Sequence, residues 1–194
     1  MKAFLRILLV VFGISAIILI IAAGRGSIFN NNKMDNEEKK SGSLILKSSA
    51  FKEGDTIPAK HTCDGDNVNP LLEIRNIPAN TKSMAVIVED PDATRGEIWA
   101  HWLVWNIEPK TQYISEDNVP FGAVQGKNSG GHERYDGPCP PRGNPPHRYM
   151  FKVFALDVVL DLPAGSVKAD LEKAMTGHIL DQAKLMGLYG RKVM

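Results

Sequence analysis

The stretch IWAHWLVWNI, residues 98–107, contains all three tryptophans of the chain together with aliphatic and β-branched residues. Such residues favour a β-strand that packs against other elements. Because successive side chains of a strand point to opposite faces, strict alternation places His101 on one face with Leu103 and Trp105. The sequence therefore predicts a buried strand with a histidine among large apolar side chains.

Segments of similar composition lie on both sides of this stretch and are separated by clusters of Gly, Pro, Asn and Asp. They are SLILK (43–47), LLEIRNI (71–77), SMAVIVED (83–90), a short segment near 123–126, and RYMFKVFALDV (148–158). Short strands joined by loops, without alternating helices, favour an antiparallel arrangement. We predict an all-β, Greek-key-type β-sandwich.

The segment from residue 166 to 192 breaks this pattern. It contains two groups of apolar residues at helical spacing, interrupted by glycines. These groups are Val167, Leu171, Ala174 and Met175, then Ile179, Leu180 and Ala183. We predict two short C-terminal helices, the first capped by Ser166, with Gly177 and Gly187 as their ends.

Residues 1–26 have the composition of a targeting segment. Ile7 to Ala23 contains no charged residue, and basic residues lie on both sides of it. The length of this uncharged segment, seventeen residues, lies between that of the apolar region of a cleaved signal peptide and that of a transmembrane helix. A retained membrane anchor is favoured, which places the domain on the extracytoplasmic side, and cleavage after Gly24 would give a secreted or periplasmic protein.

The remainder divides into a polar linker, residues 27–42, and one folded domain, residues 43–194. The domain contains 17 Lys and Arg residues against 19 Asp and Glu residues, a net charge of −2. This balance gives no long-range attraction to nucleic acid, so nucleic acid is not expected as a partner.

Two cysteines, Cys63 and Cys139, lie in this domain. A disulfide between them would persist outside the cytoplasm. Sequence separation does not show whether the two Cα atoms lie within about 7 Å, so two unpaired cysteines are an equal alternative.

The loop GPCPPRGNPP, residues 137–146, precedes the strand that begins at His147. Its five prolines fix the backbone and remove amide donors, which suits the wall of a preorganised pocket. The prolines equally suit an edge that must not pair with another chain. Period-two alternation places His147 and Tyr149 on the same face of the following strand.

Asp90 and Asp92 flank a proline at the end of the segment SMAVIVED. Turn formation explains both residues, and Asp90 is the better candidate for a site because it directly ends a buried strand.

Four ordered motifs are DPDA (90–93), WAHWLVWNI (99–107), GPCPPRG (137–143) and HRYMFKVFAL (147–156). Together they resemble the phosphatidylethanolamine-binding proteins, the family that includes the Raf kinase inhibitor protein. The resemblance is strongest to the bacterial branch, through TCDGDNVNP (62–70) and the LYGR ending, and it covers residues 43–191.

The resemblance implies a β-sandwich with a small pocket for phosphate or similar anions, including a phospholipid head group. The residues that it assigns to ligand binding are Asp90, His101, Gly137, Pro140, Pro141, His147 and Tyr149. It also implies a protein target such as a kinase or protease, and a homodimer. The segment between DPDA and the histidine strand is shorter than in eukaryotic members, and one histidine follows Trp99 instead of two. Kinase regulation is therefore in doubt here.

An enzyme is the alternative, because two histidines and an aspartate could serve a hydrolase or phosphoesterase. Against it, no motif of an activated nucleophile is visible. A metal site would have an incomplete ligand set, so we expect no metal and no cofactor.

Overall fold

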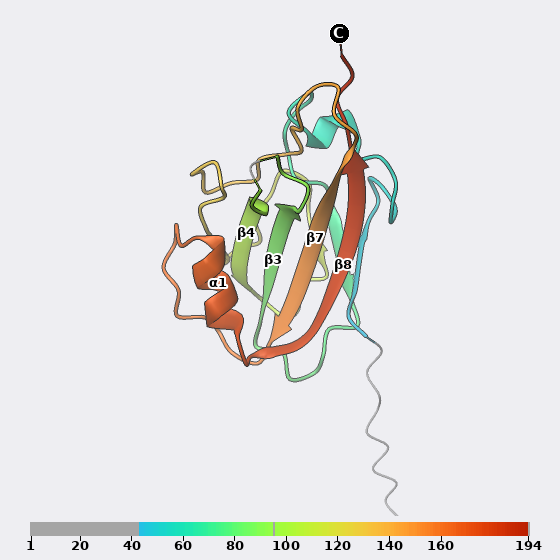
Figure 1. Cartoon of the computed structure of the whole chain (residues 1–194). Helices are drawn as coiled ribbons and strands as arrows, with labels where there is room; N and C mark the ends of the chain where they lie inside the picture. The colour runs from blue at the N-terminus through green and yellow to red at the C-terminus, as the bar shows by residue number, and fades with distance from the viewer. Residues whose placement is uncertain (1–42, 95, 194) are drawn as a thin grey trace, which may run out of the picture. The chain divides into compact units, whose positions relative to one another are not determined.

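The strands form two antiparallel sheets, of three and five strands, in the computed structural model (Figure 1). The model describes residues 43–94 and 96–193, so the predictions for residues 1–26 and 27–42 lie outside the described residues. No helix within the described ranges is long and apolar enough to cross a membrane. The elements are β1 (Ile45–Ser48), η1 (Ala59–His61), β2 (Leu72–Arg75), β3 (Ser83–Asp90), β4 (Trp99–Ile107), β5 (Tyr113–Ile114), β6 (Val124–Gln125), β7 (His147–Leu156), α1 (Lys168–Met175) and β8 (Ile179–Tyr189).

The larger sheet has the order β6-β4-β3-β7-β8, and the smaller has the order β1-β2-β5. Side chains that alternate along β3 enter two different cores. Met84, Val86 and Val88 join the core that also contains residues of β1 and β2. Ala85 and Ile87 join the second core, which includes residues of α1. The predicted antiparallel, mainly β fold is therefore confirmed.

Strand β3 has the predicted bounds, and the ends of the other predicted strands differ from the observed ones by at most two residues. The two-residue strand β5 lies in a segment for which no strand was predicted. It contributes buried Ile114, which pairs with Leu72 of β2. Two residues are too few for an alternating pattern to be visible in the sequence.

The strict alternation predicted for residues 99–107 is wrong, because the register between β3 and β4 shifts at two places, one of them at His101. Val88 pairs with Trp102 and Glu89 pairs with Ala100, so His101 has no partner on β3. Such a β-bulge redirects the side chains beside it. Leu103 and Trp105 accordingly pack in the core with α1. His101 instead contacts Tyr149, a residue of the core between the sheets.

Only the first of the two predicted C-terminal helices exists. It is α1, which begins after Val167 and not after the predicted cap Ser166. The second is replaced by β8, which pairs with β7 along the edge of the larger sheet (Figure 1). In β8, Leu185 and Tyr189 are buried on one face. Pairing with a ten-residue partner strand outweighs the helical spacing, since most of the stability of a short helix comes from tertiary packing.

Gly187, which was predicted to end a helix, lies inside β8 for a steric reason. A Cβ atom there would lie 2.5 Å from Cγ1 of Ile57 and 2.8 Å from Cε2 of Phe51. Both neighbours are buried, so neither can move freely. β8 can approach Ile57 and Phe51 this closely only because residue 187 has no side chain.

Gly187→Ala should therefore destabilise the domain by about 1–3 kcal/mol, the usual cost of overpacking. Urea denaturation of the domain measures this change. Gln182→Ala, at an exposed position of the same strand, is the control and should have a much smaller effect. Equal stability of Gly187→Ala and wild type would contradict the proposed packing.

Candidate functional site

A cavity of about 400 Å³ lies at the end of the sandwich where β3 ends and where β4 and β7 begin. All seven residues that the family resemblance assigned to ligand binding line it. They are Asp90, His101, Gly137, Pro140, Pro141, His147 and Tyr149. Their convergence from two strands, a strand end and a loop is a property of the fold, and their role in binding a ligand stays a prediction.

Asp90 and His147 form a buried hydrogen bond at the floor of the cavity. Nδ1 of His147 lies 2.8 Å from Oδ2 of Asp90, and both side chains are less than 10% exposed. The other carboxylate oxygen, Oδ1, accepts the backbone N–H of Asp92 at 2.8 Å. Because a carboxylate only accepts, Nδ1 of His147 carries the hydrogen, and its Nε2 is left for other contacts.

Asp92, which does not line the cavity, forms hydrogen bonds with Arg148, the residue of β7 that follows His147. It accepts three hydrogen bonds from Arg148: from the backbone N–H at 2.9 Å, Nε at 2.8 Å and Nη2 at 2.7 Å. The hydrogen bonds from the Arg148 side chain lower the pKa of Asp92 to about 2. The turn explanation for Asp92 is thus incomplete, since its side chain also fixes the start of β7.

His101 is held by the backbone of Asp136. Its Nδ1 lies 2.5 Å from the carbonyl oxygen of Asp136, and its own carbonyl accepts the Asp136 N–H at 3.0 Å. A carbonyl can only accept, so Nδ1 of His101 carries a hydrogen. Burial lowers the pKa of His101, although the carbonyl of Asp136 and the charge of Asp90 partly oppose this effect. The neutral imidazole is therefore favoured.

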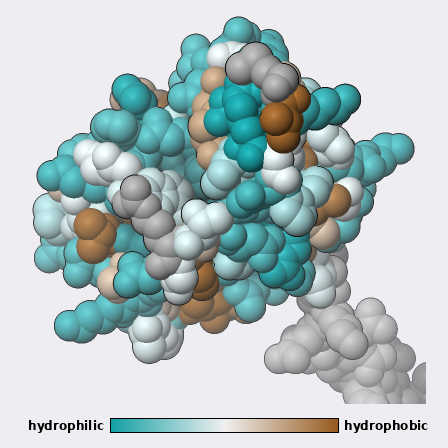
Figure 2. Space-filling model, turned by 45° about the horizontal axis from the view of Figure 1, so that its top comes forward, coloured by the Kyte–Doolittle hydropathy of each residue, from teal (hydrophilic) through white to brown (hydrophobic). Residues whose placement is uncertain are grey.

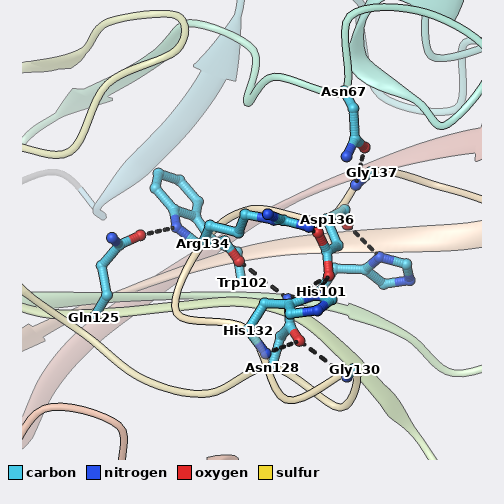
Figure 3. A network of polar contacts seen from close by, with 10 residues as sticks. All are labelled: Asn67, His101, Trp102, Gln125, Asn128, Gly130, His132, Arg134, Asp136 and Gly137. Atoms are coloured by element: carbon cyan, nitrogen blue, oxygen red, sulfur yellow. Dashed lines mark hydrogen bonds and ion pairs between the residues drawn. The ribbon is translucent and has the colours of Figure 1, made fainter.

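The side chain of Asp136 anchors the loop that carries this carbonyl (Figure 3). Its Oδ2 accepts hydrogen bonds from Asn128 at 2.8 Å and His132 at 2.7 Å, and its Oδ1 accepts one from Nε of Arg134 at 3.0 Å. Burial alone would raise the pKa of Asp136, but these three hydrogen bonds outweigh it and the pKa is lowered. The carboxylate is therefore ionised and fully engaged.

Tyr149 lies between the two histidines. Its ring is 5.2 Å from that of His101 and 6.5 Å from that of His147, measured between centroids. The phenol oxygen is buried and makes no well-formed hydrogen bond among the described residues, although the carboxylate of Asp90 and the backbone of Cys139 lie within its reach. Burial, with the nearby charge of Asp90, raises the pKa of Tyr149, so the phenol keeps its hydrogen. A buried hydroxyl without a well-formed hydrogen bond costs about 1–3 kcal/mol, so the phenol is available for a better-placed acceptor.

The wall formed by residues 137–141 is fixed to the segment that follows η1. Gly137 donates its N–H to Oδ1 of Asn67 at 2.7 Å, as Figure 3 shows, and Cys63 donates its N–H to the carbonyl of Pro138 at 3.1 Å. A Cβ atom at residue 137 would lie 2.4 Å from the carbonyl oxygen of His61. Only glycine permits this approach.

Cys63 and Cys139 form a disulfide in the structure, with Cα atoms 5.4 Å apart. Beside it, Asp64 accepts hydrogen bonds from Oη of Tyr189 at 2.7 Å and from Nε of Arg191 at 3.0 Å. The end of β8 and the LYGR ending are thus attached to the same segment as the proline-rich loop. The proline-rich loop therefore forms a wall of the cavity, and its prolines do more than prevent a sheet edge from pairing with another chain.

Sequence reasoning missed half of the residues that line the cavity. These are Cys63, Asn67, Ala93, Thr94, Trp99, Asp136 and Cys139, of which only the cysteines were singled out, for a disulfide. Asp136 had a local signal, because it stands directly before Gly137 and Pro138. Asn67 could be found less readily, since its left-handed backbone, with a φ of 59°, depends on the loop's packing. The described residues contain no cluster of three or more His, Cys, Asp or Glu side chains that could hold a metal ion.

The model of the family named phosphatidylethanolamine-binding protein matches residues 47–190, most of the described part of the chain. The chain belongs to this family. A UPF0098 protein of Methanothermobacter thermautotrophicus is 46% identical over 153 residues, which cover 76% of this chain and 99% of that protein. The recognition made from four sequence motifs is therefore confirmed.

Solved structures agree with this assignment. A phosphatidylethanolamine-binding protein homologue of Chlamydia trachomatis has 41% identity and a TM-score of 0.73, covering 78% of this chain and 99% of that one. YbcL of Escherichia coli, described as a member of the mammalian phosphatidylethanolamine-binding protein family, has 34% identity and a TM-score of 0.73, covering 76% and 98%. The fold around the cavity is therefore the fold of this family.

The contact between Asp92 and Arg148 gives a pH-dependent prediction. A carboxylate whose pKa is lowered from about 3.9 in the unfolded chain to about 2 stabilises the fold above pH 4, and this stabilisation is lost as the pH falls toward 2. Asp92→Asn should therefore be less stable than wild type at pH 5–7, and the difference should shrink between pH 4 and pH 2. Chemical denaturation at several pH values measures it. Asp161→Asn, at an exposed carboxylate, is the control, and a difference that does not change with pH would contradict the assignment.

Proposed function

We propose that this domain is a binding module that takes a small anionic or phosphorylated ligand into the cavity between β3, β4 and β7. The observation that carries the proposal is the convergence of His101, His147 and Tyr149 on one cavity. The phenol of Tyr149, which makes no well-formed hydrogen bond within the described part of the chain, can donate its hydrogen to a ligand oxygen. Nε2 of His147 can accept a hydrogen from the ligand, because Nδ1 is engaged with Asp90.

The walls of the cavity support a small ligand. Its volume of about 400 Å³ lies near the lower end of the range of small-molecule sites. Pro140, Pro141, Trp99 and Ala93 contribute apolar surface to the lining. Prolines and the disulfide reduce the freedom that the loop would lose on binding, which favours affinity.

The surface at this end of the domain also favours a small polar ligand. Figure 2 shows mostly hydrophilic residues on the visible face, with apolar residues in small separate patches. A continuous apolar face would be expected for a stable protein interface. A kinase or protease target, and a homodimer, stay predictions that rest on family resemblance.

Extracytoplasmic location is part of the proposal. It is supported by the uncharged segment Ile7–Ala23 behind basic residues and by the disulfide between Cys63 and Cys139. A retained anchor would hold the domain near phospholipid head groups, which are one source of the anion. The N-terminal residue of the protein purified from membranes distinguishes a retained anchor from a cleaved signal peptide.

Tyr149→Phe tests the binding role directly, because it removes the hydroxyl and keeps the ring. The variant should be as stable as wild type or slightly more stable without ligand, since an unpaired buried group is lost. It should bind inorganic phosphate or O-phosphoethanolamine about 10- to 100-fold more weakly, the loss expected for a hydrogen bond to a charged group. Isothermal titration and the ligand-induced shift in melting temperature measure both effects.

Tyr113→Phe is the matched control, because its hydroxyl lies on β5 and contacts Glu73 instead of the cavity. Unchanged affinity in Tyr149→Phe would contradict the proposed contact. Turnover of a phosphoester by wild type that disappears in His101→Ala would favour the hydrolase alternative.

A further inference from the structure

The hydrogen-bonding roles around the cavity restrict the charge state of its ligand. Nδ1 of His101 already donates to the carbonyl of Asp136, so in the neutral ring only the lone pair of Nε2 remains. That nitrogen can accept a hydrogen bond and cannot give one. An anion without a hydrogen would place an oxygen lone pair against this lone pair, and the two groups repel.

The other charged groups around His101 do not relieve this repulsion. Asp90 approaches from β3, His147 and Tyr149 from β7, and Asp136 from the loop before residue 137. None of the described residues that line the cavity is a lysine or an arginine. Two carboxylates and no permanent cation therefore face the site, which is unfavourable for a doubly charged or hydrogen-free oxyanion.

Building on the proposed function, we propose that the cavity selects a phosphate group that carries its own hydrogen. This group is a phosphomonoester in its monoanionic form, R–O–PO₃H⁻, in preference to a phosphodiester. The P–O–H group donates to Nε2 of His101, and another phosphate oxygen accepts the hydrogen of Tyr149. Nε2 of His147, whose Nδ1 donates to Asp90, is a second acceptor for a hydrogen carried by the ligand.

Phosphodiesters lack the group that this arrangement needs. A monoester loses its second hydrogen with a pKa near 6, so the monoanion is abundant in mildly acidic solution. A diester, such as the head group of an intact phospholipid, has no P–O–H near neutral pH. It can bind only if His101 is protonated, which burial opposes. The hydrogen of the P–O–H group thus distinguishes a phosphomonoester monoanion from a phosphodiester, although both carry one negative charge.

The test compares O-phosphoethanolamine with glycerophosphoethanolamine, its diester counterpart, by isothermal titration of the full chain between pH 5.5 and pH 8. We expect the monoester to bind at least about tenfold more tightly at pH 6, and its affinity to fall about tenfold per pH unit above its second pKa. 2-Aminoethylphosphonate, whose second pKa is higher, should show the same decline displaced to higher pH. A profile that follows the ligand's pKa cannot result from a structural role of His101.

His101→Gln should reduce both the preference for the monoester and the pH dependence, because the glutamine amide can donate as well as accept. His178→Gln is the matched control, since Nδ1 of this histidine is also engaged by an oxygen, here of the Asp157 carboxylate, but the residue lies where β8 begins, at the far end of the sheet. If His101→Gln does not fold, the pH dependence of the affinity of wild type for the three ligands still tests whether the cavity prefers the protonated monoester. Equal affinities for monoester and diester across the pH range would overturn this inference and leave the proposed function intact. Absence of binding by all three ligands would overturn both.

Discussion

Two aspartates at the end of β3 hold two consecutive residues at the start of β7, and the site depends on this contact. Asp90 forms a hydrogen bond with His147 inside the cavity, and Asp92 forms hydrogen bonds with Arg148 outside it. The backbone N–H of Asp92 also donates to Asp90, so the two carboxylates are fixed relative to each other. The contact of Asp90 with His147 is buried, whereas that of Asp92 with Arg148 is exposed to solvent and therefore contributes less to stability. The contact thus fixes where β7 begins, and with it the positions of His147 and Tyr149.

The opposite wall is fixed by different means. Residues 137–141 are stiff because of their prolines, but stiffness alone does not place a loop. Their position comes from the disulfide of Cys63 with Cys139 and from the hydrogen bond of Gly137 with Asn67. Loss of any one of these contacts leaves the others, so the wall should tolerate single changes better than the floor of the cavity. The chemistry is concentrated at the floor, where Asp90 and His147 have no substitute.

The sequence was informative where a local pattern decides the structure. β3 and β7 alternate regularly, and the positions of Tyr149 and His147 followed from that alternation. It was misleading where pairing with a distant strand decides. The apolar spacing of residues 179–183 suits a helix, but β7 offers a ten-residue edge to pair with, and β8 forms there. The bulge at His101 is equally invisible, because it depends on the register between β3 and β4. Family motifs found the cavity residues because they record the outcome of such long-range packing.

An anion site that contains two aspartates requires that both be engaged. Asp90 accepts hydrogen bonds on both oxygens, from His147 and from the backbone of Asp92. Asp136 is likewise engaged on both oxygens by groups of its own loop (Figure 3). Each carboxylate therefore directs its lone pairs toward protein donors, and in the proposed complex the phenol of Tyr149 donates to the ligand. Groups such as Asn128, which do not line the cavity, determine whether the carboxylate of Asp136 is engaged within its own loop or is free to repel an anion. The affinity proposed for the cavity therefore depends on the partners of its aspartates as well as on the residues that line it.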